Sequence, residues 1–330
     1  MPRILSGIQP SGRLHLGNYC GAIRQFVALQ QDYEMFIFVA SYHALTSTSD
    51  PQALRCAMRD VVIDYLAYGL DGERCNIYLQ HDLPEVTELA WILGCHCPKY
   101  MMDKAVSFKD KTAKGLAASI GLYTYPVLQA ADILIVDADL VPVGRDQVQH
   151  IEITRDIAQR FNHGLGAGEQ LLKPPAYRLD PSAEVLPGID GQKMSKSYGN
   201  TIDPFMGEKP LRKRIMRIVT DSTPVEDPKD PESCPVFAIF RAIAGAEDER
   251  SRDLADRYRN GGLAYGHAKQ ALFELIMDHF AEARRQRARL VADPGLIDAV
   301  LARGAAAARA AAGPVMERVR RAVGLGACKE

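Results

Sequence analysis

The sequence predicts an α/β fold in which a parallel sheet carries helices on both faces and is followed by an all-helical region. Short apolar runs alternate with stretches of helical periodicity up to about residue 205, and only helical periodicity follows. The chain has 330 residues, of which 47% are hydrophobic and 25% are charged, an ordinary globular composition with room for two domains. We therefore expect an α/β domain over residues 1–205 and a helical domain over residues 206–330.

Four short apolar runs are the predicted strands. A continuous apolar run such as EMFIFVAS is typical of a strand that is covered on both faces, as in a doubly wound parallel sheet. The four runs are Arg3–Ser6, Glu34–Ser41, Asn76–Gln80 and Ile133–Val136.

The helices between these runs are predicted from spacing and capping. Apolar residues at helical spacing indicate a helix over Gly17–Gln31. Asp50 followed by Pro51 is typical of a helix N-terminus, and this helix continues to about Tyr68. A further helix is expected over Pro84–Leu93.

Beyond residue 206 the apolar residues keep a helical period. One face joins Leu211 to Ile218, and a longer helix carries its apolar face from Leu272 to Phe280. The alanine-rich stretch 305–312 is read as helix because alanine is the best helix former, with Gly304 and Gly313-Pro314 as punctuation.

The charge is uneven along the chain. The net charge is −1, but residues 206–330 carry 22 Lys and Arg against 18 Asp and Glu. The arginines near the C-terminus form either a solvated helix face or a surface that binds a polyanion, and charge alone leaves both open. No stretch of ~18 apolar residues and no secretory leader is present, so we expect a cytoplasmic protein without membrane spans.

The cysteines give little sign of a metal or of disulfides. Their number, seven, is odd, which does not suit a disulfide framework. Cys95 and Cys97 are separated by one residue, unlike the usual two-residue gap of a zinc knuckle, so ordinary thiols are favoured and no metal site is expected.

The turn after the first strand is the first candidate site. Three glycines lie between Ser6 and Asn18, and the next helix begins at about Gly17. A helix N-terminus at the carboxyl end of a parallel strand favours anions, and His15 and Asn18 would add two donors there. A plain tight turn with a chance histidine is the alternative.

The second candidate is the loop Gly191–Asn200. It holds Lys193 and Lys196 with two hydroxyl groups between glycines. Lysine is a mobile point charge that suits phosphate oxygens, and flanking glycines favour a loop that closes on its ligand. A solvated basic loop is the alternative.

These two segments resemble the signatures of class I aminoacyl-tRNA synthetases. His15-Leu16-Gly17-Asn18 resembles the HIGH signature, and Lys193-Met194-Ser195-Lys196-Ser197 is identical to KMSKS. The rest is similar to the tryptophanyl-tRNA synthetases of bacteria in segments that span most of residues 1–225. These segments are SGIQPSG (6–12), GNYCGAIRQFVALQ (17–30), HALT (43–46), YPVLQAADIL (125–134), VPVGRDQVQHIEITRDIAQRFN (141–162), LPGIDGQKMSKSYGN (186–200) and IVTDS (218–222).

The resemblance implies a Rossmann-type catalytic domain that activates tryptophan with ATP and transfers it to tRNA(Trp). Because the substrate carboxylate is the nucleophile, the protein has to supply only positioning and charge stabilisation. The implied catalytic residues are His15, Asn18, Lys111, Lys193 and Lys196. The implied ATP site adds Gln9, Pro10, Ser11, Gly17, Gly144, Arg145, Asp146, Val185, Met194, Ser195 and Ser197, with Mg²⁺ carried by ATP.

Asp132 is the expected specificity residue. We expect Pro126 to open a helix whose face carries Tyr125, Gln129 and Asp132. An indole N–H is only a donor, so a carboxylate is its natural partner. Taken alone, an aspartate at this position is more often a helix-surface or capping carboxylate, and the surrounding motif favours the binding role instead. The resemblance assigns tryptophan binding to Asp132, Tyr125, Gln129, His43 and Gln147.

Several positions depart from the family pattern. Ser41 stands where most relatives have Asp, and Gln129 where many have Met. Cys234 stands alone where some members hold an iron–sulfur cluster through four cysteines, so no cluster is expected.

The resemblance further implies a homodimer and a helical domain that binds the anticodon. The last helix is expected to pack back on the catalytic domain, and the helix around Trp91 is either the dimer interface or plain core. Two alternative functions stay open: a tyrosine–tRNA ligase, and a non-catalytic paralogue that binds nucleotide or RNA.

Overall fold

The computed structural model describes residues 1–104, 118–179 and 185–326, with Asp146 described by its backbone only. Its centre is a five-stranded sheet in the order β3-β2-β1-β4-β5, and every neighbouring pair is parallel. The order reverses between β1 and β4, as in a doubly wound fold. The strands are β1 (Arg3–Ile8), β2 (Glu34–Val39), β3 (Cys75–Leu79), β4 (Leu140–Val143) and β5 (Ala176–Leu179).

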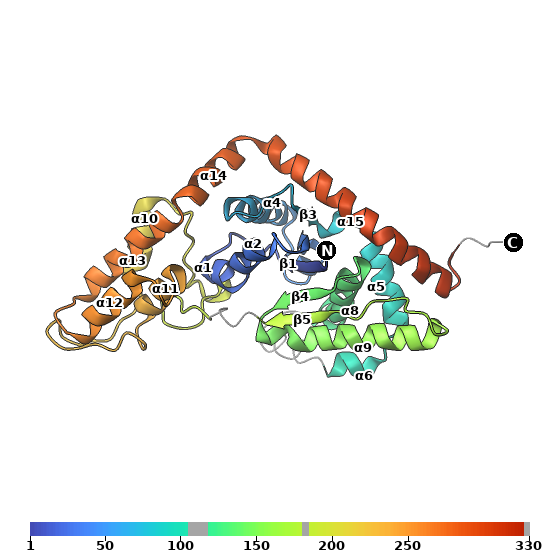
Figure 1. The fold of residues 1–330 in the computed structure, drawn as a ribbon, viewed down its shortest axis with the longest axis horizontal. Coiled ribbons are helices and arrows are strands. Elements are labelled where there is room, and N and C mark those ends of the chain that lie inside the picture. Colours follow the sequence, from blue (N-terminus) through green and yellow to red (C-terminus); the bar gives the residue numbers. More distant parts are fainter. Residues whose placement is uncertain (105–117, 180–184, 327–330) are drawn as a thin grey trace.

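Helices flank the sheet on both faces, which confirms the predicted fold class (Figure 1). Those before residue 200 are α1 (Leu16–Asn18), η1 (Tyr19–Ile23), α2 (Arg24–Leu29), α3 (Ser41–Ala44), α4 (Pro51–Ala67), η2 (Gln80–Asp82), α5 (Glu85–His96), α6 (Lys99–Asp103), α8 (Ile120–Ile135), η3 (Arg145–Gln147), α9 (Val148–Leu165) and η4 (Lys196–Tyr198). Asp50 caps α4 as expected, and its side chain accepts from the N–H groups of Gln52 and Ala53.

The predicted strand Ile133–Val136 is wrong. Residues 133–135 form the last turn of α8, and the fourth strand is Leu140–Val143. The expectation that Pro126 opens this helix is also wrong, because α8 begins at Ile120 behind Ser119, whose hydroxyl accepts from the Leu122 N–H. A short apolar run at the end of a fully buried helix looks the same as a buried strand, and this ambiguity caused the error.

From residue 208 onward the described chain forms helices, as expected. They are α10 (Glu208–Met216), α11 (Pro235–Ala244), α12 (Glu249–Arg259), α13 (Tyr265–His279), α14 (Ala281–Ala292) and α15 (Pro294–Ala322). In Figure 1, α10–α13 lie together to one side of the sheet, and α14 and α15 form an arch that returns across it. Apolar side chains of α11 and α13 share one core with those of α1, η1 and α2.

The last helix, α15, packs along the edge strand β3. Gly304 makes this contact possible, because a Cβ atom there would lie 1.9 Å from the carbonyl oxygen of Ile77. Gly304 and Gly313-Pro314 therefore lie within one continuous helix rather than punctuating it. A helix over an edge strand also covers its unpaired backbone groups.

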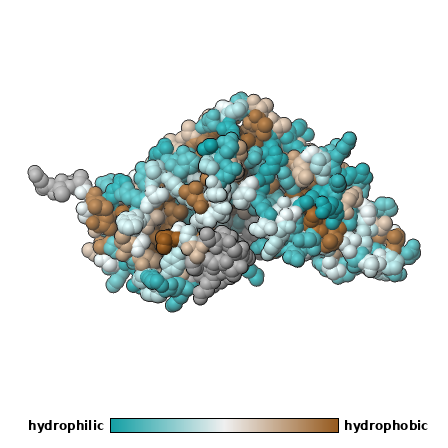
Figure 2. Space-filling view, turned by 180° about the vertical axis from the view of Figure 1, so that it is seen from behind, coloured by the Kyte–Doolittle hydropathy of each residue, from teal (hydrophilic) through white to brown (hydrophobic). Residues whose placement is uncertain are grey.

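The outer surface is largely polar. On the face shown in Figure 2, hydrophobic residues form small separate patches among hydrophilic ones. Within the described part of the chain, we find no helix with the length and apolar character needed to cross a membrane.

Candidate active site

A cavity of about 670 Å³ opens at the carboxyl ends of β1 and β4. This is the point where the strand order reverses, the usual ligand position in doubly wound sheets. Its lining comes from β1 and β4, the end of β2, η1 and α2, the start of α9, one face of α8, the segment around His43, and Lys193. The predicted residues Gln9, His43, Tyr125, Gln129, Asp132, Gly144, Gln147 and Lys193 all belong to this lining.

Asp132 lies at the base of the cavity and is only 3% exposed. Its Oδ2 lies 2.9 Å from His43 Nε2, and the Gln80 amide donates to Oδ1 at 2.8 Å and to Oδ2 at 2.9 Å. Burial raises the pKa of the Asp132 carboxyl, while the hydrogen bonds from His43 and Gln80 lower it. The fold therefore fixes a buried acceptor at the wall of the cavity, where it can receive a hydrogen bond from a ligand.

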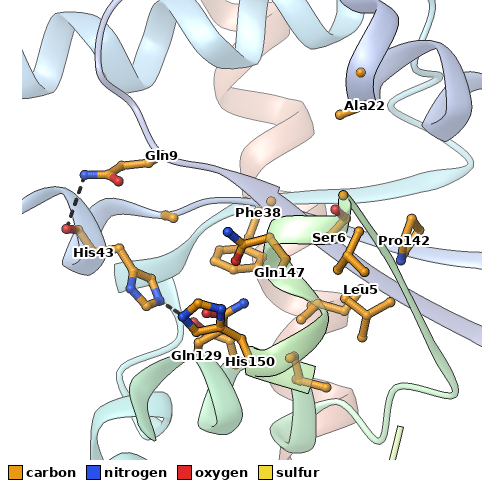
Figure 3. Close-up of a pocket in the computed structure, with 18 of the residues that line it drawn as sticks. Leu5, Ser6, Gln9, Ala22, Phe38, His43, Gln129, Pro142, Gln147 and His150 are labelled. Carbon is orange, nitrogen blue, oxygen red and sulfur yellow. Dashed lines mark hydrogen bonds and ion pairs between the residues drawn. The ribbon is translucent and has the colours of Figure 1, made fainter. Parts of the chain in front are cut away.

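Tyr125 stands one helical turn from Gln129 on the same face of α8. Its hydroxyl lies 2.7 Å from His150 Nε2 on α9. Figure 3 shows the side chains of His43, Gln129 and His150 converging, with Gln147 above them. Although Pro126 does not open the helix, the predicted shared face of residues 125, 129 and 132 exists because α8 continues through it.

The turn after β1 holds His15 at the start of α1. The His15 backbone N–H donates to Asn18 Oδ1 at 3.1 Å, and the His15 ring is 7% exposed. Burial, and then the positive charge of Lys196, lowers the pKa of His15 to about 4. His15 Nδ1 is buried without a hydrogen-bond partner among the described residues. A neutral imidazole with one unpartnered nitrogen therefore lies at this turn, outside the lining of the cavity.

Asn200 organises the loop that carries Lys193 and Lys196. It is 1% exposed, accepts from the Ser195 N–H at 2.8 Å and donates to the Lys193 carbonyl at 3.0 Å. Gly188 packs against it, since a Cβ atom there would lie 2.3 Å from Asn200 Cγ. This core holds the loop in shape while the Lys193 side chain stays exposed.

Lys196 reaches from this loop to the turn after β1. Its Nζ donates to the Gly12 carbonyl at 2.8 Å and to Ser11 Oγ at 3.3 Å. Burial lowers the pKa of Lys196 to about 8, against the opposing pull of Asp64 and Asp203. The second signature and the turn after β1, which are 184 residues apart at Lys196 and Gly12, thus meet at one ammonium group.

The other residues predicted for the ATP site differ in how exposed they are. Met194 is 5% exposed, and its Cβ lies against Gly17, so it packs the two segments together. Val185 is 66% exposed and lies outside the cavity lining. Pro10 is buried, whereas Ser11, Arg145 and Ser197 are exposed. Lys111 and the Asp146 side chain lie outside the described residues.

Among the residues that the sequence analysis missed, Gln80 and His150 form hydrogen bonds with predicted site residues. Gln80 fixes Asp132, and it directly follows β3, so its place at the carboxyl edge of the sheet was a usable signal. His150, the partner of Tyr125, had no such signal, because a histidine on a helix is most often ordinary core.

Ser41 and Cys234, two departures from the family pattern, both have partners. Ser41 Oγ lies 2.9 Å from His81 Nδ1 and accepts from the His81 N–H at 3.2 Å. Cys234 Sγ lies 3.3 Å from the Tyr258 hydroxyl. In the described ranges, no group of three or more His, Cys, Asp or Glu side chains is arranged to hold a metal ion.

Comparisons with known proteins identify the family of the chain. The model of the family "tRNA synthetases class I (W and Y)" matches residues 1–281. The tryptophan–tRNA ligase of Rhodopirellula baltica is 50% identical over 323 residues, which cover 98% of this chain and 99% of that protein. The corresponding ligase of Fusobacterium nucleatum is 46% identical, with 98% of each chain covered.

A solved structure is similarly close. The tryptophanyl-tRNA synthetase of Campylobacter jejuni, complexed with ADP and tryptophan, superposes with a TM-score of 0.90 at 46% identity, and 98% of this chain and 100% of that chain are covered. This chain therefore belongs to the class I aminoacyl-tRNA synthetases, in the family that serves tryptophan and tyrosine.

Proposed function

We propose that the chain is a tryptophan–tRNA ligase. The observation that carries this assignment is the buried Asp132 carboxylate, fixed by Gln80 and His43 at the base of the cavity. An indole N–H can only donate, and a fixed carboxylate oxygen is the acceptor that matches it. The high identity to curated tryptophan–tRNA ligases supports the same substrate.

In the first step, an oxygen of the tryptophan carboxylate attacks the α-phosphorus of ATP. The new oxygen–phosphorus bond forms as the bond to the β-phosphate breaks, giving tryptophanyl-adenylate and pyrophosphate. ATP enters as its magnesium complex, so the metal is part of the substrate. The chain's own contribution is placement of the reactants and stabilisation of the charge on the transferring group.

The residues around the two signature segments divide this task. We propose that His15 donates as a neutral imidazole, in keeping with its lowered pKa of about 4. Lys193 and Lys196 bind the β- and γ-phosphates, and Lys111 reaches the leaving pyrophosphate. Asn18 contacts the phosphates from the start of α1. The nucleotide also contacts Gln9, Pro10, Ser11, Gly17, Gly144, Arg145, Asp146, Val185, Met194, Ser195 and Ser197.

The amino acid occupies the deeper part of the cavity. We propose that Asp132 accepts the indole N–H, while Tyr125, Gln129, His43 and Gln147 orient the ring, ammonium and carboxylate. In the second step, a hydroxyl of the terminal ribose of tRNA(Trp) attacks the carbonyl carbon, and AMP leaves.

The remaining assignments concern organisation. We propose that residues 1–205 form the catalytic domain, that residues 206–330 bind the anticodon, and that the protein works in the cytoplasm. We also propose a homodimer through α5, where Leu89 is fully buried but Trp91 is 76% exposed. Tryptophan is enriched in the cores of protein interfaces, so an exposed tryptophan on this helix is suited to one.

The deciding experiment is ATP–pyrophosphate exchange with each amino acid separately. We expect strong exchange with tryptophan and little with tyrosine. Strong exchange with tyrosine alone would make the chain a tyrosine–tRNA ligase. Binding of ATP without exchange for either amino acid would indicate a non-catalytic paralogue.

A further inference from the structure

A buried ion pair joins the C-terminal helices to the catalytic part of the chain. Asp64 on α4 is fully buried, and its Oδ1 accepts from Arg287 Nε on α14 at 2.8 Å. Arg287 Nη2 also binds Asp60 Oδ1 at 2.9 Å, and the guanidinium lies 5.4 Å from the centre of the Phe205 ring. The arginine side chain is only 12% exposed, so solvent screens this pair weakly.

The second oxygen of Asp64 faces the first signature segment. Asp64 Oδ2 accepts from the Leu14 N–H at 3.2 Å, and Leu14 directly precedes His15. The neighbouring Leu16 N–H donates to the Ile202 carbonyl at 2.9 Å. The residues on both sides of His15 are thus fixed by distant parts of the chain. The Asp64 side chain binds the Leu14 N–H, and Ile202, in the segment after the second signature, binds the Leu16 N–H.

The charge of Asp64 also reaches the ATP side of the cavity. Asp64 is faced by Arg287 from α14, by Tyr68 directly after α4, by Lys196 of the second signature and by Asp203 from the segment that follows it. Asp60 on α4 shares Arg287 with Asp64. Burial raises the pKa of Asp64 to about 6, although Arg287 and the Leu14 N–H lower it. In turn, the negative charges of Asp64 and Asp203 raise the pKa of Lys196 and so favour its ammonium form.

Two more arginines of the helical region bind the segment 199–206, which follows the second signature. Arg284 on α14 donates to the carbonyls of Pro204 and Met206, to the latter at 2.8 Å. Arg214 on α10 donates to the Thr201 carbonyl at 2.9 Å and to the Gly199 carbonyl. Both bind backbone, however, whereas Arg287 acts on a carboxylate that contacts the turn carrying His15.

We propose that Arg287 and Asp64 are positioning residues for amino-acid activation. Arg287 keeps the Asp64 carboxylate ionised and in place against the Leu14 N–H, and this fixes His15 and favours the charged form of Lys196. The position of α14 is thereby coupled to the ATP site. This inference rests on the proposed function, because it concerns the same activation step.

The test compares Arg287→Met and Asp64→Asn with a matched control. Arg59→Met is the control, since Arg59 also lies on α4 and pairs with Asp298 of α15, but at an exposed position. Each purified full-length variant is assayed by ATP–pyrophosphate exchange between pH 5 and 9, together with its melting temperature. Hydrogen–deuterium exchange of residues 12–18 gives a readout that does not depend on activity.

We expect Arg287→Met to lower kcat of exchange by about 10- to 100-fold, with the KM for tryptophan unchanged, because small displacements of reacting groups are costly. Loss of the guanidinium raises the Asp64 pKa further, so the decline in kcat at low pH should move to higher pH. Asp64→Asn should lack this acid decline, and Arg59→Met should match the parent protein. Faster deuterium uptake in residues 12–18 is expected for Arg287→Met.

Several outcomes would overturn the proposal. One is a parent-like kcat and pH profile in Arg287→Met and Asp64→Asn with only a lower melting temperature, since the pair would then be structural. If Arg287→Met does not fold, Arg287→Lys and Asp64→Asn carry the same test. If the parent protein exchanges with tyrosine alone, the proposed substrate is refuted, but the variants can still be compared with the parent. If the parent is active with tryptophan and the variants have the same kcat as the parent, the inference alone is refuted.

Discussion

The two ends of the cavity differ in how their charged groups are partnered before any ligand arrives. At the amino-acid end, Asp132 receives hydrogen bonds from Gln80 and lies against His43, all on regular elements or directly beside them. At the end where we propose that ATP binds, Lys196 donates, among the described residues, to a neutral carbonyl and a neutral hydroxyl, and burial lowers its pKa. The charge of Asp132 thus has hydrogen-bond partners within the protein, whereas the charge of Lys196 would be stabilised further by an incoming polyanion. We therefore expect changes at the first end to alter specificity and changes at the second to alter rate.

The largest expected effect comes from Asp132→Ala. This change leaves the indole N–H and the Gln80 amide without their acceptor, and each unpaired buried polar group costs ~1–3 kcal/mol. The KM for tryptophan should rise by up to about 150-fold, because the unpaired indole N–H costs up to ~3 kcal/mol on binding, and discrimination against other amino acids should fall. Exchange kinetics with varied tryptophan and varied ATP measure both effects. The KM for ATP serves as the internal control, and an unchanged KM for tryptophan would remove the specificity argument.

Lys196→Ala should produce the reverse pattern. The rate of adenylate formation should fall by about 100-fold, because the ammonium stabilises charge that develops in the transition state. The affinity for tryptophan should stay within about twofold, since binding at the other end is unaffected. Single-turnover formation of the adenylate measures the rate. Lys99→Ala is a suitable control, because Lys99 pairs with Asp103 on an exposed face. A large loss of tryptophan affinity would break the comparison between the two ends.

The elements with a clear local pattern are those that the sequence could predict. The strands β1 to β3 and the helical C-terminal region follow from periodicity, and the signature segments were found by spacing and chemistry. The strand β4 was missed because it is four residues long and follows a buried helix whose end is equally apolar. The exposed edge strand β5 carries no apolar run, so no pattern marked it.

Contacts between distant segments were beyond the sequence for a physical reason. Neither the Asp64–Arg287 pair nor the support of Asp132 by Gln80 follows from local pattern, because each joins elements that only the tertiary fold brings together. Gly304 was predicted to interrupt the alanine-rich helix. It lies instead where α15 approaches the backbone of Ile77 closely. Its role depends on the neighbour rather than on the helix itself.

A smaller effect is expected from the ionisation of His15. Its pKa of about 4 in the folded protein lies below the ordinary value of 6.5, so the unfolded chain takes up the proton first. The stabilisation is complete above pH 6.5, is lost progressively as the pH falls from 6.5 towards 4, and is absent below 4. Relative to His15→Asn, the parent protein should lose about 2 kcal/mol of unfolding free energy between pH 7 and pH 4.5. Urea unfolding at both values tests this, and equal losses in the two proteins would show that His15 is charged in the fold.

The smallest expected effect is that of Ser41→Ala, which tests whether the departure from the family pattern reaches the cavity. Ser41 is 5% exposed, and its hydroxyl binds the backbone and ring of His81 rather than lining the cavity. Loss of these bonds should lower the free energy of unfolding by ~1 kcal/mol and leave the KM for tryptophan unchanged. Urea unfolding and exchange kinetics measure the two quantities, with Ser49→Ala at an exposed position as the control. A raised KM for tryptophan would instead mean that Ser41 and His81 help to position the segment that carries His43. Residues behind the lining of the cavity would then contribute to tryptophan binding.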